Sequence, residues 1–337
     1  MTTQRKIATI ILLAVLPCLF LIASVCIGRY SVSVSEVLLC IRQWLTGIPA
    51  GVSSETYAVV TQIRLPRAFF GIMVGAALSV SGAAFQGLFR NPLVSSGILG
   101  VSSGAGFGAA LSILLFSSVL FTPIFAFVFG VVAVVLSYIV GKLAGTNTSI
   151  TLVLGGTIIQ SIFGALLSLV KYVADTDTQL PSITFWMMGS LASTRTADLL
   201  LAGIPILVGI LGLLLMRWRI NVLSMGDREA RTLGLHVGAN KAAVISFATL
   251  ATAGAVSISG VVGWIGLVVP HMGRMLIGND NRWLIPTCIS LGGCFALAVD
   301  TICRTLVGTE IPLSVVSALV GGPFFIYLLK KTKGGSW

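Results

Sequence analysis

Residues 68–89 read AFFGIMVGAALSVSGAAFQGLF and contain no Asp, Glu, Lys or Arg. A helix needs roughly 20 apolar residues to cross the hydrocarbon core of a bilayer, and this stretch is long enough to do so. The whole chain has the same character, since 56% of its 337 residues are hydrophobic, 9% are charged and 38 are glycine. These values lie outside the range of soluble globular domains, so the sequence predicts a membrane protein.

The uncharged stretches around residues 68–89 predict an all-α polytopic protein with about ten transmembrane helices. Residues 7–27 are too long for a signal-peptide core and lack a small-x-small cleavage site, so they are expected to remain as the first helix. Residues 91–141 exceed one crossing and are expected to break near Thr122-Pro123. Residues 242–273 are expected to hold two short spans, with Gly260, Gly263 and Gly266 between them. The other expected spans are 150–170, 199–216, 283–299 and 311–329.

Lysine and arginine decide the orientation. With an even number of spans both termini lie on one side of the membrane, and 14 of the 21 Lys and Arg residues then fall on that side. Cytoplasmic loops carry the excess of Lys and Arg, so both termini are expected in the cytoplasm, with the protein in the inner membrane of the cell. The net charge of +11 follows from this topology, and nucleic-acid binding need not be invoked.

No long linker or soluble domain interrupts the sequence, and residues 1–337 are expected to form one transmembrane domain. A faint internal repeat relates GAALSVSG at 75–82 to AGAVSISG at 253–260, and the two helices run in opposite directions in the predicted topology. Inverted repeats are typical of transporters, although similar composition of small-residue helices is an alternative explanation. Glycines spaced by four, as in Gly71/Gly75 and Gly100/Gly104/Gly108, favour close helix packing.

The sequence contains no recognisable motif for ATP binding, proton coupling, metal binding or catalysis. No G-x-x-x-x-G-K-[ST] loop is present, so a partner must bind the nucleotide if ATP drives this protein. No expected span carries a charge at its centre, which argues against a proton-coupled carrier. His236 and His271 have no carboxylate at a metal-ligand spacing, and the six cysteines form no C-x-x-C pair. Neither a metal site nor an integral-membrane enzyme is therefore expected.

Charge is densest in residues 225–241, MGDREARTLGLHVGANK, within an expected cytoplasmic segment at about 217–241. Asp227 and Glu229 near its start and Arg231 toward its end suit the dipole of a short helix. Two interpretations stay open at this point: a solvated loop, which the composition alone favours, and a docking element for a partner.

Several motifs, in order, resemble the FecCD-type permeases of ABC importers for iron-siderophores, haem or cobalamin. They extend over nearly the whole chain: IRLPR at 63–67, GAALSVSGAAFQGLFRNPLVSSGILGVSSGAG at 75–106, WMMGSL at 186–191, GDREARTLGL at 226–235, GWIGLVVPHMGR at 263–274 and EIPLSVVSALVGGPFFIYLL at 310–329. The resemblance implies a ten-helix protomer that works as a homodimer in the lipid bilayer. It also implies two cytoplasmic ATPase subunits that bind ATP and Mg, and an extracytoplasmic substrate-binding protein; this chain is expected to bind no cofactor itself.

The resemblance assigns three sets of residues. The ATPase-coupling residues are Gly226, Asp227, Glu229, Ala230, Arg231, Leu233 and Gly234. The residues expected to dock the binding protein are Arg64, Arg67 and Arg304, and their planar guanidinium groups suit carboxylate partners. Thr148 and Ser149 match the cytoplasmic gate, although Thr148 also suits a helix N-cap. WMMGSL matches a short extracytoplasmic helix, whereas residues 28–61 match no motif.

The expected function is therefore transport and not enzymatic conversion. The chain is expected to be the permease of a binding-protein-dependent importer, with alternating access driven by the separate ATPase. A ferric siderophore or haem is the first expectation for the cargo, and molybdate, tungstate or cobalamin is the alternative. A proton-coupled secondary carrier and a membrane enzyme are the lesser hypotheses from other classes.

Overall fold

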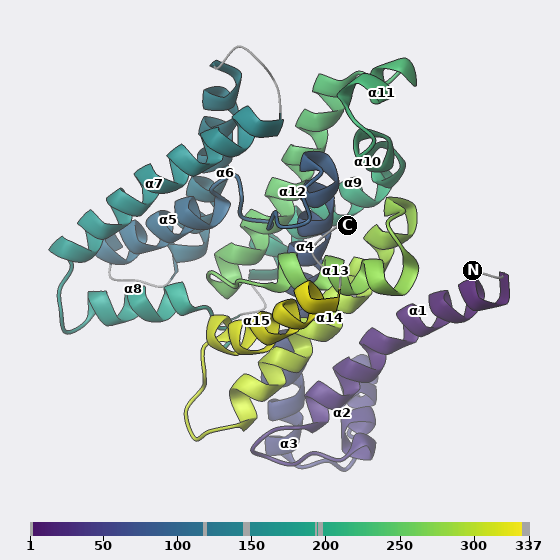
Figure 1. Cartoon of the computed structure of the whole chain (residues 1–337). Coiled ribbons are helices and arrows are strands. Elements are labelled where there is room, and N and C mark those ends of the chain that lie inside the picture. Colours follow the sequence, from purple (N-terminus) through teal and green to yellow (C-terminus); the bar gives the residue numbers. More distant parts are fainter. Residues whose placement is uncertain (1–2, 117–119, 144–148, 193, 195–197, 332–337) are drawn as a thin grey trace.

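The computed structural model describes residues 3–116, 120–143, 149–192, 194 and 198–331, and every regular element in these ranges is helical. Figure 1 shows their arrangement. The elements are α1 (Thr3–Cys26), α2 (Val34–Thr46), α3 (Ser54–Ala58), the π-helix η1 (Val59–Arg64), α4 (Leu65–Phe89), α5 (Val101–Phe116), α6 (Thr122–Leu143), α7 (Ser149–Val173), α8 (Gln179–Met188), the π-helix η2 (Leu199–Gly203), α9 (Ile204–Leu215), α10 (Arg217–Leu223), α11 (Asp227–Thr232), α12 (Val237–Ser259), α13 (Ile265–Ile277), α14 (Asn281–Thr305) and α15 (Leu313–Lys331).

Several helices have the length and composition to cross a membrane. Five do so as long helices in the described part of the chain: residues 54–89, α6, α7, α12 and α14. A sixth consists of residues 200–215 and α10, which are bent by 61° at the break between them. The apolar parts of α1, α5, α13 and α15 are shorter, at 10–17 residues. The prediction of an all-α polytopic protein is therefore confirmed.

The helix boundaries confirm the expected break in residues 91–141 and contradict the expected division of residues 242–273. The break near Thr122-Pro123 is confirmed, since α5 ends at Phe116 and α6 begins at Thr122. Residues 242–273 do not hold two short spans, because α12 is a full 23-residue helix and only α13, with 13 residues, is short. Residues 260–264, which are not helical, separate them, and Trp264 has φ 69°, a strained value for a residue other than glycine. Its ring meets Phe325 of α15.

Helix α4 lies at the centre of the molecule, and nearly every residue from Val74 to Phe89 is buried. Glycine permits this. A Cβ at Gly82 would lie 1.9 Å from the carbonyl oxygen of Gly266 in α13, and one at Gly75 would lie 2.1 Å from that of Gly292 in α14. A Cβ at Gly104 or Gly108 of α5 would likewise press on the backbone of α6. The predicted close packing through glycine is confirmed.

The two segments of the faint repeat lie in α4 and α12, and the helices touch, since the Ser81 hydroxyl donates to the carbonyl oxygen of Ala248 at 3.2 Å. They run in opposite directions, as predicted. Helix α4 ends beside α10, where Gly87 packs against Ile220, whereas α12 begins there, directly after α11. We name this end of the molecule, at the top of Figure 1, the α11 end. The opposite end, which carries α2 and α3, is the α2 end.

Residues 28–61, for which the sequence offered no motif, build the α2 end. Helix α2 begins with a capping box in which the Ser33 hydroxyl accepts from the backbone N–H of Glu36 and the Glu36 carboxylate accepts from that of Ser33. Val37 and Cys40 bury one face of α2 in a cluster with α1 and α4, together with Val25, Leu65 and Ala68. This packing holds α2 beside the ends of α1 and α4.

Candidate functional sites at the two ends

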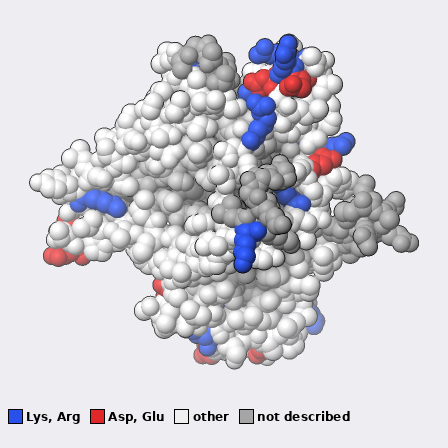
Figure 2. Space-filling model, in the orientation of Figure 1, with Lys and Arg blue, Asp and Glu red and all other residues white. Residues whose placement is uncertain are grey.

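At the α11 end, the chain leaves the membrane helices through α10 and turns sharply into α11. Gly226, at the turn, has φ 132°, which side-chain-bearing residues rarely adopt. Helix α11 carries Asp227 and Glu229 in its first turn and Arg231 in its last, as the dipole prefers. Figure 2 shows basic and acidic side chains gathered at this end, with further charged side chains scattered over the rest of the same face. We call residues 217–235 the α11 segment.

One side of α11 is fixed to the body of the protein. Ala230 is fully buried, and the Lys241 ammonium of α12 donates to the Asp227 carboxylate at 2.7 Å. The Lys241 side chain is 5% exposed and that of Asp227 is 36% exposed, so the pair lies at the edge of the interior. Helix α11 and the start of α12 are thus joined by an ion pair as well as by the chain between them.

The other side of α11 faces away from the protein. Arg228, Glu229, Arg231, Leu233 and Gly234 are exposed, and the Leu233 side chain is 56% exposed. Of the seven residues predicted to couple to an ATPase, Gly226, Asp227 and Ala230 hold α11 in place, and Glu229, Arg231, Leu233 and Gly234 are accessible. The α11 segment therefore combines a rigid attachment with a mixed apolar and charged outer surface.

At the α2 end, the structure brings together the three arginines that the sequence assigned to docking. Arg67 of α4 donates to Asp300 of α14 through Nε at 3.0 Å and Nη2 at 2.9 Å, and to Glu310 through Nη1 at 2.6 Å. Arg304 of α14 lies 3.5 Å from Asp300 Oδ2. We name Arg64, Arg67, Arg304, Asp300 and Glu310 the arginine cluster.

Arg64 and Arg304 also satisfy the backbone at the end of α1. The last carbonyls of a helix have no donors within the helix and carry its partial negative charge. Arg64 Nη1 donates to the carbonyl oxygens of Val25 at 2.7 Å and Cys26 at 3.2 Å, and Arg304 Nη2 donates to that of Ser24. The arginine cluster thus fastens α1, α4 and α14 together.

Arg64 and Arg67 are only 8% and 9% exposed, so they are more buried than residues expected to dock a partner. The contact of these arginines with a binding protein stays a prediction. The sequence reasoning missed Asp300, because the expected span ended at residue 299 whereas α14 continues to Thr305. The spacing of Asp300 and Arg304 by four residues was the available signal.

The predicted gate falls at the start of α7. Ser149 is the first residue of α7 and is half-buried, and Thr148 lies outside the described residues. WMMGSL was expected to form a short helix, and α8 does end within it at Met188, having begun at Gln179. Its backbone continues into contact with the break after α12, where the Ser190 N–H donates to the carbonyl oxygen of Ser259 at 2.9 Å.

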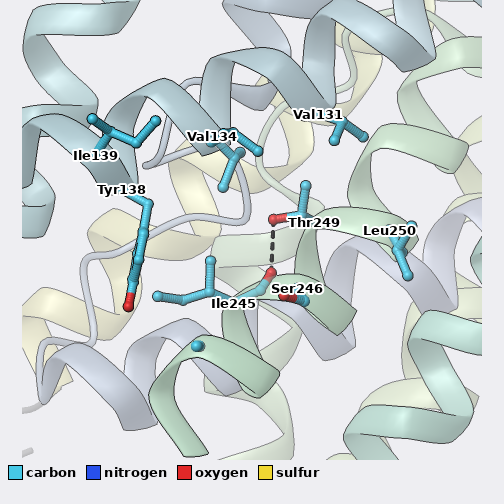
Figure 3. Close-up of a pocket in the computed structure, with 10 residues that line it drawn as sticks. Val131, Val134, Tyr138, Ile139, Ile245, Ser246, Thr249 and Leu250 are labelled. Carbon is cyan, nitrogen blue, oxygen red and sulfur yellow. Dashed lines mark hydrogen bonds between the residues drawn. The ribbon is translucent and has the colours of Figure 1, made fainter. Parts of the chain in front are cut away.

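A groove of about 320 Å³ lies between α6 and α12. Figure 3 shows Tyr138 and Val134 of α6 facing Ile245 and Thr249 of α12 across it. The lining side chains are mostly aliphatic, and the Thr249 hydroxyl donates to the Ile245 carbonyl oxygen at 2.7 Å. The groove offers apolar volume and no charged ligand. Within the described ranges, no group of three His, Cys, Asp or Glu residues is placed to hold a metal ion.

Comparison with known proteins agrees with this architecture. The family model of the FecCD transport family matches residues 13–331. The molybdate import system permease protein MolB of Haemophilus influenzae is 38% identical over 316 residues, which cover 93% of each chain. The hemin transport system permease protein HmuU of Yersinia pestis is 37% identical over 277 residues, covering 80% of this chain and 83% of that protein.

A solved structure extends the likeness to three dimensions. It is described as an inward-facing conformation of a metal-chelate type ABC transporter, is 37% identical in sequence and superposes with a TM-score of 0.84 over 95% of this chain and 97% of the other. Membrane-crossing helices, an exposed α11 segment and a family match along almost the whole sequence lead to one assignment. This chain belongs to the FecCD transport family, the permease subunits of ABC importers in which a separate subunit hydrolyses ATP.

Proposed function

We propose that this chain forms the membrane pathway of a binding-protein-dependent importer, as one transmembrane domain that works as a homodimer with two ATPase subunits. Its α11 end lies in the cytoplasm together with both termini, in keeping with the excess of Lys and Arg on that side. ATP and Mg bind to the partner subunits, and this chain binds no cofactor. The observation that carries the proposal is the α11 segment, which is rigidly attached and outwardly accessible in a protein of this family.

The α11 segment is the contact with the ATPase. Leu233 supplies an exposed apolar residue, and Arg228, Glu229 and Arg231 supply charges that remain free to pair with a partner. Movement of the ATPase reaches the membrane helices through Ala230, which is packed in the body, and through the Asp227–Lys241 ion pair to α12. Because Lys241 is the fifth residue of α12 and lies close to its start, displacement of α11 acts directly on that helix.

The homodimer places the pathway beside α7. Ile150, Leu154, Ile158 and Ile162 form an exposed apolar stripe along this helix, and Thr157 and Ser161 lie next to it. Exposed hydroxyl groups beside an apolar stripe suit a helix that meets a second copy on one side and an aqueous pathway on the other. Ser149, at the cytoplasmic start of α7, is then placed for the gate that it shares with Thr148.

The binding protein docks at the α2 end, on Arg64, Arg67 and Arg304. Their positions support this, because residues from α4 and α14 converge at the end opposite the ATPase contact. Replacing Arg64 and Arg67 by Glu tests the docking only when folding is monitored, since both guanidinium groups have internal partners. We expect loss of binding-protein affinity in variants that still assemble with the ATPase; retained affinity in an assembled variant would remove these residues from the docking site.

A ferric siderophore or haem is the first candidate for the cargo, as expected for a metal-chelate importer. Molybdate or tungstate is the second candidate, and a specific observation favours it: the relative named for molybdate import matches over 93% of both chains. Small, apolar walls such as those of the α6–α12 groove do not select between a bulky chelate and a small oxyanion. Selection is then the task of the binding protein.

The deciding experiment is uptake into proteoliposomes that hold this chain and its ATPase, with ATP inside and the binding protein outside. Labelled ferric siderophore, haem, cobalamin and molybdate are compared. Accumulation of one of them that needs both ATP and the binding protein supports the importer and identifies its cargo. Accumulation driven by a proton gradient without ATP would refute the proposal in favour of a secondary carrier.

A further inference from the structure

Arg67 is held by two carboxylates that occupy different edges of its guanidinium group. Asp300 takes the edge formed by Nε and Nη2, at 3.0 and 2.9 Å. Glu310 takes the outer edge, accepting from Nη1 at 2.6 Å and from Nη2 at 3.2 Å. This paired, planar arrangement is the one in which arginine recognises carboxylates most strongly.

The two carboxylates differ in how firmly they are fixed. The Asp300 side chain is 1% exposed, belongs to the regular helix α14 and also faces Arg304. The Glu310 side chain is 31% exposed and lies in the connection between α14 and α15, where residues 306–309 are exposed. Solvent, and therefore a partner, can reach Glu310 but not Asp300.

Glu310 also lies close to the start of α15. The Ile311 N–H donates to the carbonyl oxygen of Cys303 at 3.1 Å, and the Leu313 N–H donates to that of Gly189 at 3.0 Å. These are backbone bonds at the two sides of Pro312. The Arg67–Glu310 pair is thus the side-chain tether that ties the entry of α15 to α4.

We propose that Glu310 is an internal stand-in for a carboxylate of the binding protein: docking exchanges Glu310 for the partner's acidic side chain on Arg67. The exchange releases the side-chain tether at the start of α15, which is then held by its backbone bonds to Cys303 and Gly189. The inference rests on the proposed function and adds to it a competing residue and the movement that docking triggers. Arg67 keeps a carboxylate on each edge before and after the exchange, so the guanidinium group is never left buried and unpaired.

The charges of the cluster permit this exchange. The cluster holds three arginines and two carboxylates, and within the described part of the chain Arg64 pairs with backbone carbonyls and not with a carboxylate. The cluster therefore carries one uncompensated positive charge while Glu310 is bound, and it attracts an acidic surface before any contact is made. Once the partner's carboxylate approaches, two acids compete for one outer edge of Arg67, and the more weakly fixed one leaves. Glu310, which is partly solvated already, has the lower cost of leaving.

The test is Glu310→Gln in the full transporter, assembled with its ATPase in lipid nanodiscs. The probe is the purified substrate-binding protein of the same transport system, loaded with its ligand. Glutamine keeps the volume and one acceptor oxygen but removes the competing charge, so the affinity should rise by about fivefold. Basal ATP hydrolysis without the binding protein should also rise, because the side-chain tether at the start of α15 is weakened when the charge of Glu310 is removed.

Glu55→Gln is the matched control. Glu55 is an exposed carboxylate of α3 at the same end of the molecule, and its removal changes the net charge equally without touching Arg67. It should alter the affinity less than about twofold, as for other rim charges. An affinity gain for Glu310→Gln no larger than that for Glu55→Gln, or a loss, overturns the exchange.

A second variant guards against misfolding. Glu310→Asp keeps the charge but shortens the reach to Arg67, and it should give a smaller gain in affinity in the same direction. No gain in a Glu310→Asp protein that melts at the temperature of the unmodified one would again overturn the exchange. If the unmodified transporter does not bind the binding protein, both the proposed function and the exchange are refuted. If it binds but neither variant gains affinity, only the exchange is refuted.

Discussion

The arginine cluster and the α11 segment lie at opposite ends of the molecule, and both concentrate charge in a chain that has little. In the arginine cluster the charged groups meet one another and the carbonyls at the end of α1, and Arg67 is 9% exposed. In the α11 segment only Asp227 meets a described partner by ion pair, and Arg228, Glu229 and Arg231 are exposed. Buried charges hold helices together, because separating the helices would leave a buried charge unpaired at a high cost in free energy. Exposed charges add little to stability and remain accessible to a partner.

The largest expected effect is the loss of stability on replacing Asp300 at the α2 end. Replacing Asp300 by Ala leaves Arg67 and Arg304 facing each other at the α2 end with one carboxylate fewer, and removing one partner of a buried ion pair destabilises a protein by roughly 3–5 kcal/mol. We expect a clear fall in melting temperature and in the yield of folded protein in detergent. Asp300→Asn, which keeps the shape and an acceptor oxygen, should cost less. A melting temperature unchanged in Asp300→Ala would show that the cluster is not structural.

At the α11 end the largest effect is expected from Ala230→Pro. The Ala230 N–H donates to the carbonyl oxygen of Gly226 at 2.9 Å, and proline removes this bond and costs a helix interior about 3 kcal/mol. A six-residue helix cannot absorb that cost, so the ATPase should continue to hydrolyse ATP while uptake falls to background. Uptake in proportion to hydrolysis, measured in proteoliposomes, would contradict the coupling role of the α11 segment.

Lys241→Met tests whether the ion pair at the α11 end contributes less to stability than the ion pairs at the α2 end. Methionine keeps the apolar stem of the side chain but removes the ion pair to Asp227, whose partly solvated carboxylate can return to water. A partly exposed pair contributes about 1 kcal/mol or less, so transport per ATP should fall by no more than about fivefold. The melting temperature should stay within the error of the unmodified protein, unlike that of Asp300→Ala. A large loss of stability would mean that the α11 end is held in the same way as the α2 end.

The smallest effect concerns Glu36 at the start of α2. The Ser33 hydroxyl and backbone N–H donate to its carboxylate and hold the pKa of Glu36 below its ordinary value. The carboxylate therefore supports α2 above the ordinary glutamate pKa of about 4.3, and this support is lost as the pH falls through the lowered value. In a variant whose only tryptophan is Trp44 of α2, emission should stay constant from neutral pH down to the ordinary glutamate pKa and change only as the pH falls through the lowered value. Ser33→Ala should move that change to higher pH; an unmoved transition would separate it from the capping box.

Much of the fold follows from patterns within single stretches of sequence. The uncharged stretch at 68–89 predicts a membrane helix, and the spaced glycines predict the close contacts that Gly75 makes with α14 and Gly104 makes with α6. The exact ends of the helices are less predictable from uncharged stretches, because a helix can continue past its apolar part into polar and charged residues. Residues 54–67 continue the helix of α4 outward, and α14 runs past Val299 to Thr305.

The candidate sites were predicted unevenly for the same reason. Gly226, Asp227 and Arg231 follow one another in the sequence, so a local motif suffices to place them in a short helix. Arg67 is 233 residues away from Asp300 and 243 residues away from Glu310, and no local pattern brings it together with them. Motif resemblance identified the arginines, but their acidic partners went unnoticed.

The sequence by itself determined that this is a helical membrane protein and to which transport family it belongs. Those properties depend on hydrophobicity summed over about 20 residues and on motifs that are contiguous in the chain. Only the tertiary structure decided which charges are paired: the same residue types are buried against helix ends and carboxylates at the α2 end and left exposed on α11. The free energy of a charge depends on what surrounds it in space, and that is set by helices far apart in the sequence.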